Sequence, residues 1–166
     1  SNEICRKLEE GILDIGIIRD PLELSKFEAH FLKKESWIAI VGREHPLAGR
    51  REIQVEELFE EPLFIPSRQP LYDEICGWFS EKAGEIRVLG KYNQVASVLP
   101  LIAANMGVGI CPESVDKYAD CQRISCLKLT KPERASRLYM VRMRNKLLPA
   151  SARVFWEFIG RYGMDV

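Results

Sequence analysis

The chain alternates between two hydrophobic periods, and this alternation gives the first indication of its fold. Apolar residues recur at helical spacing in five segments: Ser1–Glu10, Gln54–Phe59, Leu71–Ala83, Gln94–Asn105 and Ala150–Tyr162. Apolar runs of strand length lie between or beside them: Ile12–Ile18, Phe27–Leu32, Ser36–Val41, Leu63–Ile65, Ile86–Leu89, Val108–Cys111, Ile124–Leu129 and Arg137–Met143. Strands that alternate with helices predict an α/β protein with a mostly parallel sheet.

Several residues are expected to shape these elements. Gly11 should end the first helix, and Asn93 should cap the helix 94–105, because its side-chain oxygen can accept a bond from a free helix amide. Pro100 falls inside that helix and should bend it. The strand 12–18 reads as buried on both faces. The last helix should bury an apolar stripe, made of Val154, Phe155, Phe158 and Ile159.

The stretch ANMGVGICPES, residues 104–114, contains two glycines that invite comparison with a nucleotide-binding loop. A dinucleotide loop follows a strand and precedes a helix, so that helix amides meet the phosphates. Here the helix comes first and the strand follows. We therefore interpret Gly107 as a left-handed helix stop, and Gly109 as a residue that lets the strand pack closely on the helix.

Charge and composition narrow the classes of function. The 166 residues carry 24 Lys and Arg against 24 Asp and Glu, so no bulk positive charge would draw them to DNA or to an anionic membrane. No apolar run approaches the roughly 18 residues of a membrane span. The chain opens without an apolar signal segment, which favours a cytoplasmic protein.

The sequence lacks the common catalytic and metal-binding patterns. Ser67 does not lie in a GxSxG turn, and no histidine and acid are placed to complete a hydrolase triad. The five cysteines form no CxxC pair and are not spaced with the histidines as zinc ligands. We therefore predict no catalytic residue, no metal and no cofactor, and a protein that is not an enzyme.

Polar residues stand where an open α/β sheet binds ligands, at the carboxyl ends of strands and at helix N-termini. These residues are Ser1 and Asn2, Arg19 with Asp20, Ser67 with Arg68, and Asn93. Two helix N-termini and an arginine would suit a small carboxylate or phosphate. The alternative for each cap is that it only satisfies the amides of its own helix.

Five segments also carry a family likeness: LEEGILDIGIIRDP, ESWIAIVGREHPLA, EELFEEPLFI, VLPLIAANMGVGICPES and LPASARVFWEFI. The most specific parts are L-x-x-G-x-L-D-I-G at Leu8–Gly16, H-P-L-A at His45–Ala48 and G-V-G-I-x-P at Gly107–Pro112. In order and spacing they resemble the C-terminal effector-binding domain of LysR-type transcriptional regulators. The likeness runs from residue 1 to about residue 162.

The resemblance implies an α/β fold of two lobes, like a type 2 periplasmic binding protein, with a small inducer in the cleft. Subdomain I would comprise residues 1–66 and 131–166, and subdomain II residues 67–130. The chain would cross between them near 66–70 and 128–136. The first strand–helix unit of that domain and the DNA-binding domain have no counterpart in the sequence. Effector contacts are implied at Ser1, Arg19, Ser67 and Asn93, to which Asn2 and Arg68 are added as neighbours.

The same resemblance implies the partners. They are a small, anionic effector, a second copy in a homodimer, and a tetramer in the full-length regulator. DNA would be bound through the N-terminal domain that lies outside this sequence. The alternative is a periplasmic-type solute-binding protein, or an enzyme, of the same topology.

Overall fold

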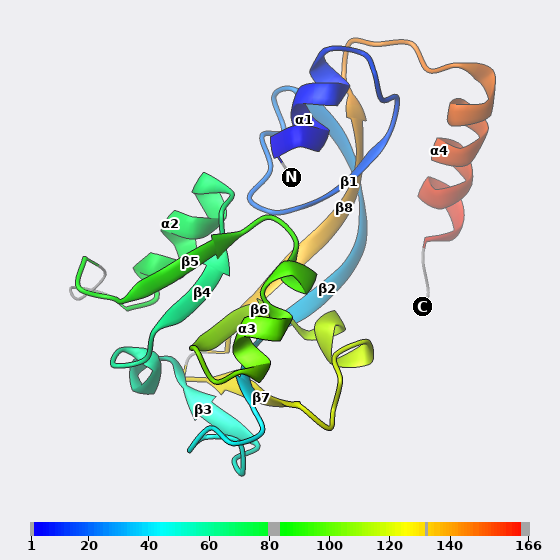
Figure 1. Ribbon diagram of the computed structural model, residues 1–166. Helices are drawn as coiled ribbons and strands as arrows, with labels where there is room; N and C mark the ends of the chain where they lie inside the picture. The colour runs from blue at the N-terminus through cyan, green and yellow to red at the C-terminus, as the bar shows by residue number, and fades with distance from the viewer. Residues whose placement is uncertain (1, 80–83, 132, 164–166) are drawn as a thin grey trace. The chain divides into compact units, whose positions relative to one another are not determined.

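A computed structural model of the chain describes residues 2–79, 84–131 and 133–163 (Figure 1). Its internal contacts divide the chain into two units: unit 1 is Ser1–Lys34 with Ser136–Val166, and unit 2 is Glu35–Ala135. The chain passes between the units at 34/35 and at 135/136. Strand β4 (Leu63–Pro66) pairs with β5 and β6 inside unit 2.

Unit 2 is a mixed sheet in the order β3-β7-β2-β6-β4-β5. Strand β4 is parallel to both of its neighbours, β5 and β6, whereas β2 is antiparallel to β6 and β7. The expectation of a mostly parallel sheet therefore holds around β4 and fails at β2. The strands other than β4 are β2 (Phe27–Gly42), β3 (Glu52–Gln54), β5 (Val88–Tyr92), β6 (Val108–Pro112) and β7 (Ile124–Thr130).

Both faces of this sheet are covered, which explains why its strands read as continuous apolar runs. On one face Trp37, Ala39 and Val41 of β2 join a core that includes helix α2 (Gln69–Gly77) and the 3₁₀ turn η1 (Val55–Leu58). On the other face Ile38 and Ile40 join a core with α3 (Leu99–Ala103) and the 3₁₀ turn η4 (Glu113–Lys117). Sequence reasoning missed β3 and η4, because each is too short to show a hydrophobic period.

Strand β2 joins two segments that the sequence analysis kept apart, Phe27–Leu32 and Ser36–Val41. The polar residues between them contain no glycine or proline, so nothing in the backbone interrupts an extended chain. Glu35 is only 5% exposed there, and its carboxylate accepts a hydrogen bond from the amide of Ser114 at 2.8 Å. Burial of this charge is possible because the carboxylate is hydrogen-bonded.

The helix expected over 94–105 is broken in two. A 3₁₀ turn η3 (Val95–Ser97) precedes α3, and Pro100 lies in the first turn of α3, where a missing amide costs nothing. Pro100 therefore starts a helix instead of bending one. Asn93 does not cap a helix either, since the residue before η3 is Gln94, which makes no side-chain capping bond.

The two glycines after α3 have different roles from each other. The left-handed residue is Asn105, with φ of 57°, so the interpretation of Gly107 as the left-handed stop was wrong. A Cβ on Gly107 would lie 2.4 Å from the carbonyl oxygen of Pro62, and this contact requires the glycine. A Cβ on Gly109 would lie 2.6 Å from Ile102 Cδ1, which confirms close packing of the strand on the helix.

Unit 1 packs a helix on each face of a small sheet, in which β8 (Ala135–Met143) lies between β1 (Gly16–Arg19) and the first part of β2. β1 and β8 run antiparallel, from Gly16 opposite Val141 to Arg19 opposite Leu138. Helix α1 (Asn2–Glu9) covers one core through Leu8, and α4 (Ala150–Tyr162) covers another through Trp156. Gly11, with φ of 76°, follows α1 as expected.

Two burial expectations for unit 1 fail. Ile12 and Ile17 are 63% and 49% exposed, so the first strand is not buried on both faces. In α4 the buried residues are Trp156 and Ile159, whereas most of the expected stripe is exposed: Val154, Phe155 and Phe158. Trp156 faces inward because its ring packs on His30, with ring centroids 4.2 Å apart, and Arg142 lies over it.

The helix expected over 71–83 starts earlier, at Gln69, and ends at Gly77. The apolar residues of this segment, Leu71, Ile75, Trp78 and Phe79, are buried. Residues 80–83 of that expectation lie outside the described residues.

Candidate functional site

Strands β4 and β5 end side by side and bring two of the expected site residues together. Because the strands are parallel, with Pro66 opposite Tyr92, their carboxyl ends meet at one edge. The amide of Ser67 donates to the carbonyl of Tyr92 at 2.8 Å. The hydroxyl of Ser67 donates to Oδ1 of Asn93 at 2.5 Å. Ser67 and Asn93, 26 residues apart in sequence, therefore form one polar group.

A buried tyrosine at the end of β5, Tyr92, fixes the position of the Ser67–Asn93 pair. Tyr92 is 7% exposed, and its hydroxyl donates to the carbonyl of Ile110 in β6 at 2.6 Å. This bond holds the end of β5 to the sheet, so the adjacent Asn93 is not on a free loop. The amide nitrogen of Asn93 keeps two donor hydrogens, for which the described residues supply no partner.

Arg68 and the start of helix α2 complete this edge. Arg68 is partly buried, has an extended backbone and immediately precedes α2. Its carbonyl accepts bonds from the amides of Leu71 and Tyr72 at 3.0 and 2.8 Å, and Pro70 lies in the first turn. A helix N-terminus carries partial positive charge and favours an anion. Burial, and then a hydrogen bond with Cys76, raise the pKa of Tyr72, which keeps this phenol neutral.

Arg19 belongs to unit 1, at the end of β1. Its guanidinium donates from Nη1 to the hydroxyl of Ser136 at 2.7 Å, and Ser136 is 2% exposed. The next residue, Asp20, accepts a bond from the amide of Arg137 at 2.9 Å, which ties the strand end to β8. Arg19 is thus a partly buried cation whose orientation is set by a buried hydroxyl.

The remaining expected site residues are at the N-terminus. Asn2 is the first residue of α1, and Ser1 lies outside the described residues. Sequence reasoning did not find Ser136 or the anchoring role of Tyr92. Ser136 is 117 residues from Arg19 in sequence, and no local pattern signals that contact. Tyr92 was adjacent to a residue already chosen, and a tyrosine at a strand end is a weak signal by itself.

Other chemistry is not favoured by the described part of the chain. Within residues 2–79, 84–131 and 133–163, no three side chains of His, Cys, Asp or Glu gather as metal ligands would. Over the same residues, no helix combines the length and the hydrophobicity of a membrane span. His45 accepts a bond from the amide of Leu47 at 3.2 Å, as a turn residue does.

Comparison with known sequences gives the family. The model of the LysR substrate binding domain matches residues 1–163. The uncharacterized HTH-type transcriptional regulator YwbI of Bacillus subtilis (strain 168) is 25% identical over 164 residues, covering 96% of this chain and 54% of YwbI. The HTH-type transcriptional regulator TtuA of Agrobacterium vitis is 33% identical over 123 residues, covering 72% of this chain and 40% of TtuA. The chain spans about half the length of the curated relatives it matches.

Solved structures give the fold. The effector binding domain of QuiR in complex with shikimate superposes with a TM-score of 0.82 at 20% identity, covering 98% of this chain and 78% of that one. The regulatory domain of CcmR from Synechocystis PCC6803, in complex with 2-PG, gives 0.74 at 16% identity, with coverages of 99% and 80%. These likenesses confirm the expected α/β fold class. The chain therefore belongs to the LysR substrate-binding domain family.

Proposed function

We propose that this chain is the ligand-sensing domain of a LysR-type transcriptional regulator and that it binds a small anionic metabolite without transforming it. The family match over residues 1–163 carries the proposal. The hydrogen-bonded pair Ser67–Asn93, beside the N-terminus of α2, supports it from the geometry. An edge of this kind offers donors and a partial positive charge, but no nucleophile and base in contact.

Each proposed contact residue has a distinct role in binding the anion. Asn93 donates through its amide nitrogen, and Ser67 sets the orientation of that amide. Arg68 precedes the helix whose N-terminal amides face the anion. Arg19, whose guanidinium donates to Ser136, is the proposed effector contact within unit 1. Ser1 and Asn2 complete the proposed contacts from the start of the chain.

The proposed output is a shift between conformations. A ligand changes such an equilibrium only by the difference between its affinities for the two states. In this proposal the effector biases the pose of a homodimer, and of a tetramer in the full-length regulator, whose separate N-terminal domain binds DNA.

A thermal-shift screen of the 166-residue chain would test the binding function. The panel comprises organic acids, amino acids and sugar phosphates, and it includes shikimate and 2-PG because structures similar to this chain hold them. We expect at least one anion to raise the unfolding temperature in a concentration-dependent way. The ligand should be recovered unchanged after incubation, and turnover of it would favour an enzyme instead.

Two single variants test which residues contact the ligand. Asn93→Ala should raise the Kd of the ligand that is found by about 2- to 13-fold, since one hydrogen bond contributes about 0.5–1.5 kcal/mol. Arg19→Ala should raise it by about tenfold or more, because its bond is charge-assisted. Gln94→Ala and Arg153→Ala are matched controls, both exposed and outside the proposed contacts. The assignment is wrong if Asn93→Ala and Arg19→Ala bind as tightly as their controls do.

A further inference from the structure

Unit 2 contains a hollow at the β7 edge of its sheet, separate from the Ser67–Asn93 pair. Its volume is about 510 Å³, and its lining includes Arg43, Arg50, Arg51, Asp116, Ser125 and Cys126. Small-ligand pockets commonly measure about 300–1,000 Å³. In the order β7-β2-β6-β4 the hollow lies three strand spacings from β4, on the order of 14 Å.

The hollow arises where β3 begins to pair with β7. Their parallel register starts with Glu52 opposite Lys128, and the amide of Lys128 donates to the carbonyl of Arg51 at 3.0 Å. Ser125 and Cys126 precede this pairing and line the hollow. Because alternate amides of a strand point to the same edge, the amide of Cys126 points to that edge like the amide of Lys128. The part of β7 that precedes its pairing with β3 thus offers the backbone amide of Cys126 as a hydrogen-bond donor, in addition to side chains.

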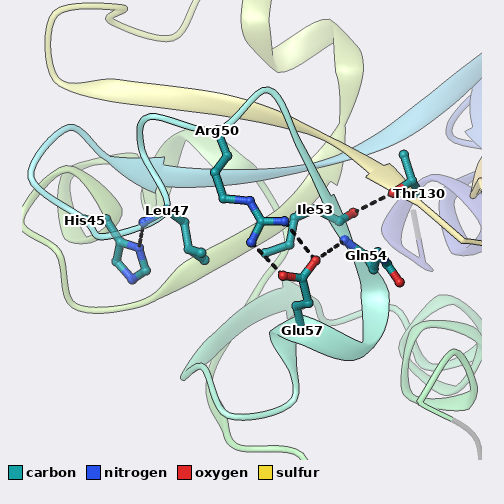
Figure 2. A network of polar contacts seen from close by, with 7 residues as sticks. All are labelled: His45, Leu47, Arg50, Ile53, Gln54, Glu57 and Thr130. Carbon is teal, nitrogen blue, oxygen red and sulfur yellow. Dashed lines mark hydrogen bonds and ion pairs between the residues drawn. The ribbon is translucent and has the colours of Figure 1, made fainter.

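The charges on the lining do not cancel. Arg50 donates from both terminal nitrogens to Glu57, at 2.6 and 2.9 Å, so its charge is neutralised (Figure 2). Arg43 donates its Nε to the carbonyl of Cys121 at 2.8 Å, a neutral partner that leaves its charge uncompensated. The side chain of Arg51 has no hydrogen-bond or ion-pair partner among the described residues. Two guanidiniums therefore stand against one lining carboxylate, Asp116.

Ser125 lines the hollow and is 7% exposed. Its Oγ is buried and has no hydrogen-bond partner among the described residues, so this hydroxyl does not reach a ligand in the hollow.

The neighbouring thiol does not oppose an anion. Burial, and then a hydrogen bond with Asp116, raise the pKa of Cys126 to about 12. The thiol therefore stays neutral at physiological pH.

We propose that this hollow is a second binding site, for a small oxyanion group, either a phosphate or a carboxylate. Arg43 and Arg51 donate charge-assisted hydrogen bonds to the anion, and the backbone amide of Cys126 donates a third. The site is independent of the effector site at Ser67 and Asn93.

The test is an NMR titration of the ¹⁵N-labelled 166-residue chain with inorganic phosphate and, separately, with acetate, at an ionic strength held constant with chloride. We expect saturable shifts at the amides of Arg51, Ser125 and Cys126. Arg51→Gln should raise the Kd about tenfold. The matched control is Arg123→Gln, which removes the same charge from an exposed residue just before β7 and outside the lining. A tighter Kd for phosphate identifies a phosphate group, and a tighter Kd for acetate a carboxylate.

The double variant Ser67→Ala with Asn93→Ala should leave the shifts at Arg51 and Ser125 unchanged. The proposal is overturned if no saturable shift appears at these amides, if Arg51→Gln and Arg123→Gln have equal effects, or if the double variant abolishes the shifts.

Discussion

At the scale of single residues, side-chain hydrogen bonds set the geometry of the candidate site. Ser67 gives its hydroxyl proton to Asn93, and Arg19 gives a guanidinium proton to Ser136. Each bond fixes the direction of a side chain that is a proposed ligand contact. Preorganisation of this kind lowers the conformational entropy that binding would otherwise cost.

Glu57 shows a residue-scale effect that pH can report. Its carboxylate accepts bonds from Arg50 and from the amide of Gln54 (Figure 2), and these lower its pKa to about 2 from 4.5. A carboxylate with a lowered folded pKa stabilises the fold above the unfolded value. That contribution is lost as pH falls from 4.5 to about 2. Its size is limited because the side chains of Arg50 and Glu57 are 42% and 38% exposed.

We therefore expect Glu57→Gln to lower stability at pH 7 by less than about 1 kcal/mol. The loss of stability on acidification through this pH window should also be smaller in the variant than in the parent chain. Urea unfolding at a series of pH values measures both effects. Glu56→Gln, at the exposed neighbouring position, is the control. An acid dependence that is identical in parent and variant would contradict the role given to Glu57.

At the scale of elements, strand β6 is held between its neighbours by two glycines that act differently. Gly107 approaches the backbone carbonyl of Pro62, next to β4, whereas Gly109 approaches the tips of Ile102 and Ile40. A backbone oxygen cannot move without shifting a strand, but a side chain can change its rotamer. The same added methyl group should therefore have unequal costs at the two positions.

Gly107→Ala should destabilise the chain by about 1–3 kcal/mol, the usual cost of overpacking. Gly109→Ala should cost less, because Ile102 and Ile40 can adjust. Gly49→Ala is the control, since a Cβ there meets nothing within 4 Å, and it should stay within about 0.5 kcal/mol of the parent. Chemical unfolding of the three variants gives this order, and a Gly107→Ala variant as stable as Gly49→Ala would refute it.

At the scale of the whole molecule, the two units differ in how the chain builds them. Unit 2 is continuous, Glu35–Ala135, and has a core on each face of its sheet. Unit 1 is assembled from both ends of the chain, and its β1 depends on pairing with β8. Continuity and a double core are what an independently folding domain requires.

We expect residues 35–135, expressed alone, to fold with a single cooperative urea transition. Tryptophan fluorescence can follow it, because Trp37 and Trp78 pack in this unit with ring centroids 5.8 Å apart. Residues 1–34 alone should remain unfolded, since they lack β8. A gradual, non-cooperative transition of the 35–135 segment would contradict the independence of unit 2.

The positions of several helices and strands could be predicted from the sequence, because they depend on neighbouring residues along the chain. The helix bounds of α4 and the apolar strand at Val108 follow from period and turn residues. So do the polar residues at strand ends, among them Ser67 and Asn93. Their partners could not be read, since each bond joins segments far apart in sequence.

By itself, the sequence determined the α/β class, the family and the chemical types of the candidate ligand contacts. Only the tertiary structure decided that β2 runs unbroken from one unit into the other, that α4 turns Trp156 inward, and that Asn93 bonds to Ser67 instead of capping a helix. The physical reason is common to all three. Local patterns specify which element forms, whereas strand register and the packing of distant residues specify which face and which partner it takes.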